Sequence, residues 1–143
     1  SFPESLGALI ENPGFIEHYS ALDNMRAIAS IKGIASENEM REILQEVGLD
    51  PDEKKSVKKY SLGMRQKLGI AIALMEKPEM ILLDEPFNAL DEKSVEKVKS
   101  IIRQRAAEGA LIIVSCHDRE ILDQIADSIY YMEEGEIIRN EEK

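Results

Sequence analysis

The sequence lacks most of the features that mark membrane-spanning, secreted or nucleic-acid-binding chains. Its longest apolar stretch, Leu68 to Met75, is far shorter than the ~18 residues that suggest a spanning helix. No basic start is followed by an apolar stretch near the N-terminus, so we expect no export signal. The single cysteine, Cys116, cannot form a disulfide within the chain, and this fits a reducing interior.

Basic residues are also under-represented, with 18 lysines and arginines against 28 aspartates and glutamates. The resulting net charge of −10 argues against broad non-specific binding to nucleic acid or anionic lipid. The 143 residues are 43% hydrophobic and 32% charged, which excludes a disordered chain and allows one real core. We therefore expect a folded chain of single-domain length.

The first half of the sequence has mainly helical patterns. A short apolar run, Leu6 to Ile10, predicts a strand followed by a loop. Ser20 and Gly33 are the expected start and stop of a helix whose apolar face is Leu22, Met25, Ile28 and Ile31. A capping-box pattern at Ser36 and Glu39 predicts a second helix that ends at Gly48. A third helix is expected from Ser61 to just before Pro78.

The second half alternates strands and helices. Three apolar runs, Met80–Leu83, Ala110–Val114 and Ser128–Met132, are separated by a helical stretch from Glu92 to Glu108 and by a shorter one around Ile121. Such alternation predicts a parallel sheet with right-handed crossovers. After a turn at Glu134 and Gly135 the chain ends in polar residues.

Several polar residues follow the predicted strands. Asp84 and Glu85 come directly after an apolar strand, and His117 follows the next one. Ligands bind beyond the carboxyl ends of strands in open α/β sheets. An aspartate there can hold Mg²⁺, a second carboxylate can activate water, and a histidine can donate a hydrogen bond to phosphate. Taken singly, a solvated turn and a surface histidine remain the better interpretations.

A further candidate site is the start of the predicted third helix. A helix N-terminus presents free N–H groups to an anion, Ser61 adds a hydroxyl, and Gly63 lets a phosphate approach the backbone. By itself, an ordinary serine N-cap is the better interpretation of this segment.

Together, in this order, these segments resemble the motifs of ABC-type ATPases. Residues 60–67 (YSLGMRQK) look like the signature motif, and residues 81–86 (ILLDEP) look like the Walker B segment. Residues 88–91 (NALD) are similar to the D-loop, and residues 114–118 (VSCHD) to the switch-histidine loop. The resemblance implies a P-loop-NTPase-like α/β fold with an α-helical subdomain. The expected division is 1–14 for the Q-loop strand and loop, 15–77 for the helical signature subdomain, and 78–143 for the C-terminal part of the ATPase core.

The resemblance also implies roles for individual residues. Asp84 would help to hold Mg²⁺, Glu85 would be the general base for ATP hydrolysis, and His117 would contact the γ-phosphate. Glu11 stands where many relatives have glutamine and would lie near Mg²⁺.

Other implied roles involve a second subunit. Ser61 and Gly63 would bind the γ-phosphate of ATP that is held by the opposite ATPase subunit of a homodimer. Asp91 would signal across that interface. Residues 7–13, together with Leu62 in place of the usual first glycine of the signature, resemble the subgroup that exports bacitracin and lantibiotics. Membership would imply a transmembrane permease as partner, no nucleic acid, and a place on the cytoplasmic face of the membrane.

One motif of the family is absent from the sequence. A P-loop needs G-x-x-x-x-G-K-[ST], and none of the eight glycines precedes a lysine. We therefore expect an N-terminally truncated chain whose parallel sheet lacks its P-loop strand. In the family that strand lies between the runs Ala110–Val114 and Ser128–Met132. The gap would expose backbone and apolar faces, and we expect the chain to rearrange, or to pair or swap strands with another copy.

Two other classes of function remain open. One is an ABC-type ATPase that is not tied to transport, such as a repair or ribosome-associated enzyme. The other is a non-catalytic interaction module, which the missing phosphate ligands favour for this chain on its own.

Overall fold

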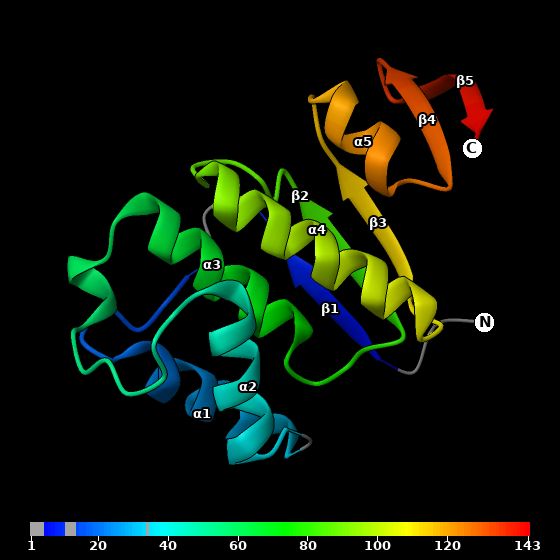
Figure 1. Cartoon of the computed structure of the whole chain (residues 1–143). Helices are drawn as coiled ribbons and strands as arrows, with labels where there is room; N and C mark the ends of the chain where they lie inside the picture. The colour runs from blue at the N-terminus through cyan, green and yellow to red at the C-terminus, as the bar shows by residue number, and fades with distance from the viewer. Residues whose placement is uncertain (1–4, 11–13, 34) are drawn as a thin grey trace.

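The computed structural model describes residues 5–10, 14–33 and 35–143 (Figure 1). Its elements, in chain order, are β1 Leu6–Leu9, α1 Ala21–Lys32, α2 Glu37–Val47, the 3₁₀ turn η1 Val57–Lys59, α3 Leu62–Leu74, β2 Met80–Asp84, α4 Glu92–Ala107, β3 Leu111–Ser115, α5 Arg119–Ile125, β4 Ser128–Glu133 and β5 Glu136–Glu142. Within these described ranges no helix has the length and apolar character needed to cross a membrane.

The helix ends follow the sequence signals closely. Ser36 accepts a hydrogen bond from the backbone N–H of Glu39, and the Glu39 carboxylate accepts one from the N–H of Ser36, which completes a capping box. Gly33 and Gly48 end α1 and α2 with φ of 66° and 93°, a conformation that glycine adopts at little cost. One expectation is wrong: Ile31 is 85% exposed, because the buried face of α1 runs from Leu22 and Met25 to Ala29, and Ile31 lies off that face.

Strands β1, β2 and β3 form a parallel sheet in that order. This confirms the predicted α/β class with a parallel sheet. Alternate residues of each strand face helices α3 and α4, and on this side Leu9, Ile81 and Leu83 are buried in the core. Figure 1 shows α4 lying across the sheet, with α1, α2 and α3 gathered at one end.

The contact between α3 and β1 is unusually close. A Cβ atom added at Gly7 would lie 1.9 Å from the carbonyl oxygen of Ala73. Only glycine therefore allows this strand to reach the helix, so the helical region from α1 to α3 is fixed directly to the sheet.

The third predicted strand does not join the parallel sheet. Residues 128–133 form β4, which pairs antiparallel with β5, and the two strands make a separate sheet. The polar ending Glu136–Glu142, for which no strand was expected, is β5. Its residues are nearly all exposed, so it lacks the apolar alternation that reveals a half-buried strand.

The second face of the parallel sheet is open within the described part of the chain. Leu6, Leu111 and Ile113 share this face and are each 48–59% exposed. Strand β3 is also an edge, since β2 is its only neighbour in the described sheet. The sequence-based expectation of an apolar face and unpaired backbone is thus confirmed at β3, whereas β4 is paired with β5.

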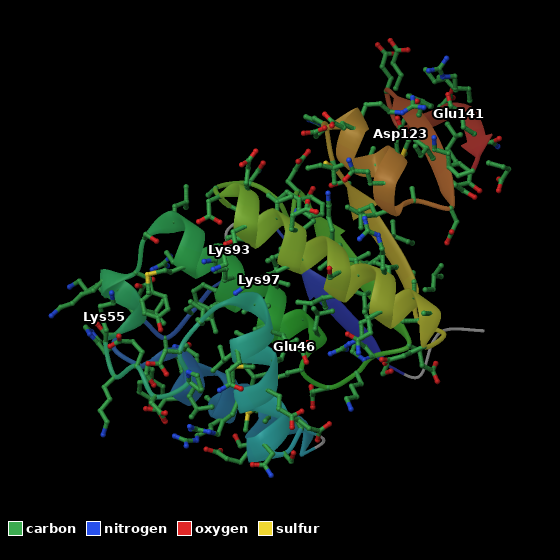
Figure 2. All side chains as sticks on the ribbon, in the orientation of Figure 1. Glu46, Lys55, Lys93, Lys97, Asp123 and Glu141 are labelled. Carbon is green, nitrogen blue, oxygen red and sulfur yellow. The ribbon has the colours of Figure 1, made fainter. Side chains whose placement is uncertain are left out.

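Helix α5 follows the edge strand β3 along the chain, and charged side chains join it to the β4–β5 hairpin. Arg119 pairs with Asp123 on its own helix and with Glu141 on β5, at 2.9 and 2.6 Å. Figure 2 shows Asp123 and Glu141 together in the C-terminal unit. The hydroxyl of Tyr131 is a further hydrogen-bond partner of Arg119. These contacts hold α5, and therefore the loop before it, against the hairpin.

Candidate functional site

Two neighbouring strands end side by side at the centre of the candidate site. Asp84 is the last residue of β2, and the parallel register pairs it with Ser115, the last residue of β3. The hydroxyl of Ser115 donates a hydrogen bond to Oδ1 of Asp84. Because parallel strands share their carboxyl ends, residues 84–85 and 115–118 meet at one edge of the sheet, as the sequence predicted.

The backbone of Glu85 is held in an uncommon conformation. Its φ is +48°, a left-handed value that costs a non-glycine residue on the order of 1 kcal/mol or more. The Glu85 N–H donates to the carbonyl of Ser115 at 2.8 Å. The Glu85 carbonyl accepts from Nε2 of Gln66 at 2.9 Å and from the N–H of Asn88 at 3.2 Å. Such strain persists only where the surroundings fix the residue, and it is concentrated at functional sites.

The side chain of Glu85 has no comparable support. Its Oε1 atom is buried and accepts no hydrogen bond within the described residues. Nδ1 of His117 approaches this oxygen to 3.1 Å, while the His117 side chain itself is 96% exposed. A buried carboxylate oxygen without a donor is costly unless a ligand or water occupies its open side. Glu85 and His117 can therefore both hydrogen-bond to a polar group that approaches from solvent.

A second group of predicted residues lies at the start of α3. Ser61 is its N-cap, and its hydroxyl accepts from the N–H of Met64 at 3.2 Å. Gly63 lies against the loop before α4: a Cβ atom there would be 2.8 Å from the carbonyl oxygen of Ala89. Ala89 has a φ of +64°. Gly63 thus has a packing role inside the chain, in addition to the open approach to backbone that the sequence suggested.

Asp91 ends the same loop and begins α4. Its carboxylate accepts from the N–H of Ser94 at 2.8 Å. The hydrogen bonds to Ser94, aided by the charges of Lys67 and Lys93, hold the pKa of Asp91 below its usual range. Asp91 is therefore an ionised N-cap, and it shares its loop with the residue that packs on Gly63.

Magnesium binding at this edge is chemically reasonable. Mg²⁺ prefers oxygen ligands and is often held by one or two carboxylates together with substrate phosphates and waters. Asp84 is an exposed carboxylate beside the Ser115 hydroxyl, which fits that donor set. No cluster of three or more histidine, cysteine or carboxylate side chains that could hold a metal occurs among the described residues. Glu11, also predicted near the metal, lies outside the described residues.

The structure thus brings Asp84, Glu85 and His117 together, and it brings Gly63 close to the loop of Asp91. Sequence reasoning missed three participants: Ser115, Gln66 and Ala89. Ser115 could have been found by aligning the last residues of the two strands. The side chain of Gln66 bonds to a backbone carbonyl, and Ala89 acts through its own carbonyl. Such backbone groups leave no signal in the side-chain pattern.

Several curated bacterial proteins are similar to the chain along nearly its whole length. It is 41% identical over 141 residues to an uncharacterized ABC transporter ATP-binding protein, YybJ, of Bacillus subtilis (strain 168), covering 99% of this chain and 65% of the relative. It is 39% identical to the lantibiotic transport ATP-binding protein SrtF of Streptococcus pyogenes, covering 96% of this chain and 59% of the relative. The bacitracin transport ATP-binding protein BcrA of Enterococcus faecalis is 37% identical, with 93% and 44% covered.

Solved structures agree with this assignment. A dimeric structure of MJ0796, a bacterial ABC transporter cassette, superposes with a TM-score of 0.86 at 25% identity, covering 96% of this chain and 62% of that one. A post-hydrolysis state of MJ0796 bound to ADP and phosphate matches equally well, with a TM-score of 0.86.

The chain spans 44 to 65% of the length of these curated relatives. The family model described as ABC transporter matches residues 1–88, which include the signature-like and Walker-B-like segments. The motifs, the fold and these similarities agree, and the chain belongs to the ABC transporter family.

Proposed function

We propose that the chain is the C-terminal portion of the ATP-binding and ATP-hydrolysing subunit of an ABC transporter that exports peptide antibiotics. The relatives named for lantibiotic and bacitracin transport support this choice of cargo class. Within the chain we assign residues 1–14 to the Q-loop strand and loop and residues 15–77 to the signature subdomain. Residues 78–143 form the C-terminal part of the ATPase core.

The observation that carries the proposal is the unbonded, buried Oε1 of Glu85 beside His117. A carboxylate in that position can accept a proton from water while the water oxygen bonds to the γ-phosphorus of ATP and the bond to the leaving ADP oxygen breaks. His117 can donate a hydrogen bond to a γ-phosphate oxygen. Glu85 is therefore the proposed general base, and His117 the proposed phosphate contact.

Asp84 is the proposed ligand of Mg²⁺, with Glu11 assigned nearby from the family resemblance alone. When bound, the ion would neutralise charge on the phosphate oxygens. Ser115 contributes by fixing one Asp84 oxygen through its hydroxyl, which leaves the other oxygen free for the ion.

Ser61, Gly63 and Asp91 are proposed to act across a dimer of two ATPase subunits. The N-terminal N–H groups of α3 and the Ser61 hydroxyl would meet the γ-phosphate held by the partner. The dimeric structure of MJ0796 supports such an assembly. A membrane permease would be the second partner and would place the subunit on the cytoplasmic face of the membrane.

We propose that the 143-residue chain does not hydrolyse ATP by itself, because its sequence contains no G-x-x-x-x-G-K-[ST] to hold the phosphates. We also propose that its open β3 edge leads it to pair or exchange strands with a second copy.

Activity is tested in a chimera in which this chain replaces the matching region of SrtF. We expect Mg²⁺-dependent ATPase activity in the chimera and none in the isolated chain. Glu85→Gln should lower kcat at least about 100-fold, since it removes the proton acceptor. Glu46→Gln, a change at an exposed position on α2 (Figure 2), is the matched control and should leave kcat unchanged.

Other outcomes separate the alternatives. An inactive but folded chimera would favour the non-catalytic interaction module. Activity in the isolated chain would contradict the proposed need for an external P-loop. An active chimera that fails to restore lantibiotic export in cells lacking SrtF would favour an ABC-type ATPase outside transport.

A further inference from the structure

We infer that Gln66 is a positioning residue that orients Glu85 and ties it to the first turns of α3. The inference rests on the proposed role of Glu85 in ATP hydrolysis and extends it to a residue that does not touch the reacting groups. Its basis is the hydrogen bond from Nε2 of Gln66 to the carbonyl oxygen of Glu85, at 2.9 Å between residues 19 positions apart.

The direction of the Glu85 carboxylate depends mainly on its own backbone, because the His117 ring that approaches Oε1 to 3.1 Å is itself 96% exposed. Oε1 accepts no hydrogen bond among the described residues, so no described donor fixes that oxygen through a hydrogen bond. The backbone, in contrast, is held on both sides: its N–H by the carbonyl of Ser115 and its carbonyl by Gln66 and the N–H of Asn88. These bonds must maintain a φ of +48° in a residue that also precedes a proline, Pro86.

Side chains of two other elements bond to the Glu85 backbone: the Ser115 hydroxyl of β3 accepts from its N–H at 3.3 Å, and Gln66 of α3 donates to its carbonyl. The Gln66 bond joins Glu85 to helix α3, whose N-cap is Ser61. On the same stretch of α3, Gly63 packs against the carbonyl of Ala89. A displacement of the first turns of α3 would therefore be transmitted to residue 85 by a hydrogen bond and to residue 89 by contact.

Through this hydrogen bond α3, the helix that contains most of the signature-like segment, contacts the proposed general base of its own chain directly. Ser61 and Gly63 are proposed to meet a phosphate held by the other subunit. The Gln66 bond would let that event alter the position of the Glu85 carboxylate within the same subunit.

The test uses nuclear magnetic resonance on the isolated 143-residue chain with Gln66→Met, which keeps the length of the side chain and removes its donor. We expect the ¹⁵N, ¹³Cα and ¹³C′ chemical shifts of Glu85 to leave the left-handed range, with changes confined to residues 84–90 and the ring of His117. Gln66→Lys, which retains an N–H donor, should restore most of the Glu85 shifts.

The matched control is Gln104→Met at an exposed position on α4, where Nε2 of Gln104 donates to Glu108 at 3.1 Å. It should leave Glu85 unchanged. Unaltered Glu85 shifts in Gln66→Met, or changes spread evenly through α3 and the core, would overturn the inference. The second outcome would show a merely structural role.

A second readout is kinetic and uses the SrtF chimera. Gln66→Met should lower kcat about tenfold or more while the KM for ATP changes less than about twofold, because Gln66 affects the base and not ATP binding. A KM for ATP that rises by the same factor as kcat falls would count against the inference. If the unmodified chimera has no activity, the proposed function fails, and the resonance experiment still decides whether Gln66 positions Glu85.

Discussion

Two non-glycine residues with positive φ, Glu85 at +48° and Ala89 at +64°, lie within one short loop. The backbone N–H of Glu85 bonds to Ser115 at the end of β3, and the carbonyl of Ala89 packs against Gly63 at the start of α3. Residue identity therefore matters at the positions that surround this loop, where a single additional atom meets a fixed carbonyl oxygen.

Gly63→Ala tests this crowding. The added Cβ would lie 2.8 Å from the Ala89 carbonyl, so either the loop or the helix start must shift. Overpacking of this kind costs about 1–3 kcal/mol, and the gain in helix propensity returns at most about 1 kcal/mol. We expect a net loss of about 1 kcal/mol in the free energy of urea-induced unfolding.

Gly14→Ala is the control, since nothing lies within 4 Å of the added atom. Equal stability of Gly63→Ala and the unmodified chain, with unchanged resonances at Ala89, would show that the loop yields freely and that the contact does not constrain residue 63.

The ion pair between Glu17 and Arg65 makes a pH-dependent contribution. The hydrogen bond from Arg65, at 2.6 Å, and the nearby positive charges lower the pKa of Glu17 from its usual value. The resulting stabilisation is fully present above the pKa of Glu17 in the unfolded chain and is lost as the pH falls through the lower folded value.

Glu17→Gln should therefore reduce the difference in unfolding free energy between pH 7 and pH 3, with most of its effect at neutral pH. Urea titrations at both pH values measure this. The partly exposed pair predicts a small effect, and a stability loss from Glu17→Gln that is as large at pH 3 as at pH 7 would refute an electrostatic origin.

At the scale of elements, helices α3 and α4 are joined by a buried hydrogen bond. Nη1 of Arg105 donates to the carbonyl of Leu74, at the C-terminal end of α3, at 2.9 Å. It adds a charged donor to a helix-end carbonyl that also accepts from the N–H of Lys77 at 3.1 Å. The bond thus fixes the end of the signature-like helix opposite to Ser61.

Arg105→Met should lower the unfolding free energy by about 1–3 kcal/mol, because the buried Leu74 carbonyl would lose its charged donor and keep only the bond from the N–H of Lys77. Thermal and urea unfolding measure the loss. Arg103→Met, an exposed change on the same helix, should have an effect below about 0.5 kcal/mol. Similar losses in both variants would point to helix propensity and not to the buried bond.

The sequence predicted elements best where local chemistry decides them. Ser36 with Glu39, and the glycines at 33 and 48, marked helix ends through bonds within a few residues. Asp84 and His117 each follow an apolar strand, and the sequence predicted that they lie at one edge of the sheet because parallel strands have their carboxyl ends on the same side. The roles assigned to the site residues remain predictions.

The sequence failed where long-range pairing decides the structure. Residues 136–142 lack apolar alternation, since the adjacent Ile137 and Ile138 fall on opposite faces and are both exposed, and only their pairing with β4 makes them a strand. The same pairing removes β4 from the parallel sheet. The sequence places Gln66 in a motif but gives it no role, because its partner is a backbone carbonyl that only the assembled fold brings close.

At the scale of the whole molecule, the open apolar face and the free edge of β3 favour self-association. Ile113→Lys places a charge on that face at a position that is 48% exposed, and the core should tolerate it. We expect the unmodified chain to form dimers or larger species at micromolar concentration, and Ile113→Lys to shift it toward monomer.

Sedimentation velocity over a concentration series measures this equilibrium. Glu120→Gln, at an exposed position on α5, makes the same change of net charge and is the control. A chain that stays monomeric at high concentration, with a free β3 edge, would contradict the proposed pairing of two copies.

The parallel pairing of β1 with β2 has a consequence for the order in which the chain folds. The two strands meet across a long separation, and Ser5 contacts Glu79 at a distance of 74 residues along the sequence. Closing so long a loop is entropically costly until the intervening helices are compact. We infer that β1 pairs with β2 late, after α1 to α3 have formed, and that the close contact between Gly7 and α3 is the last to form.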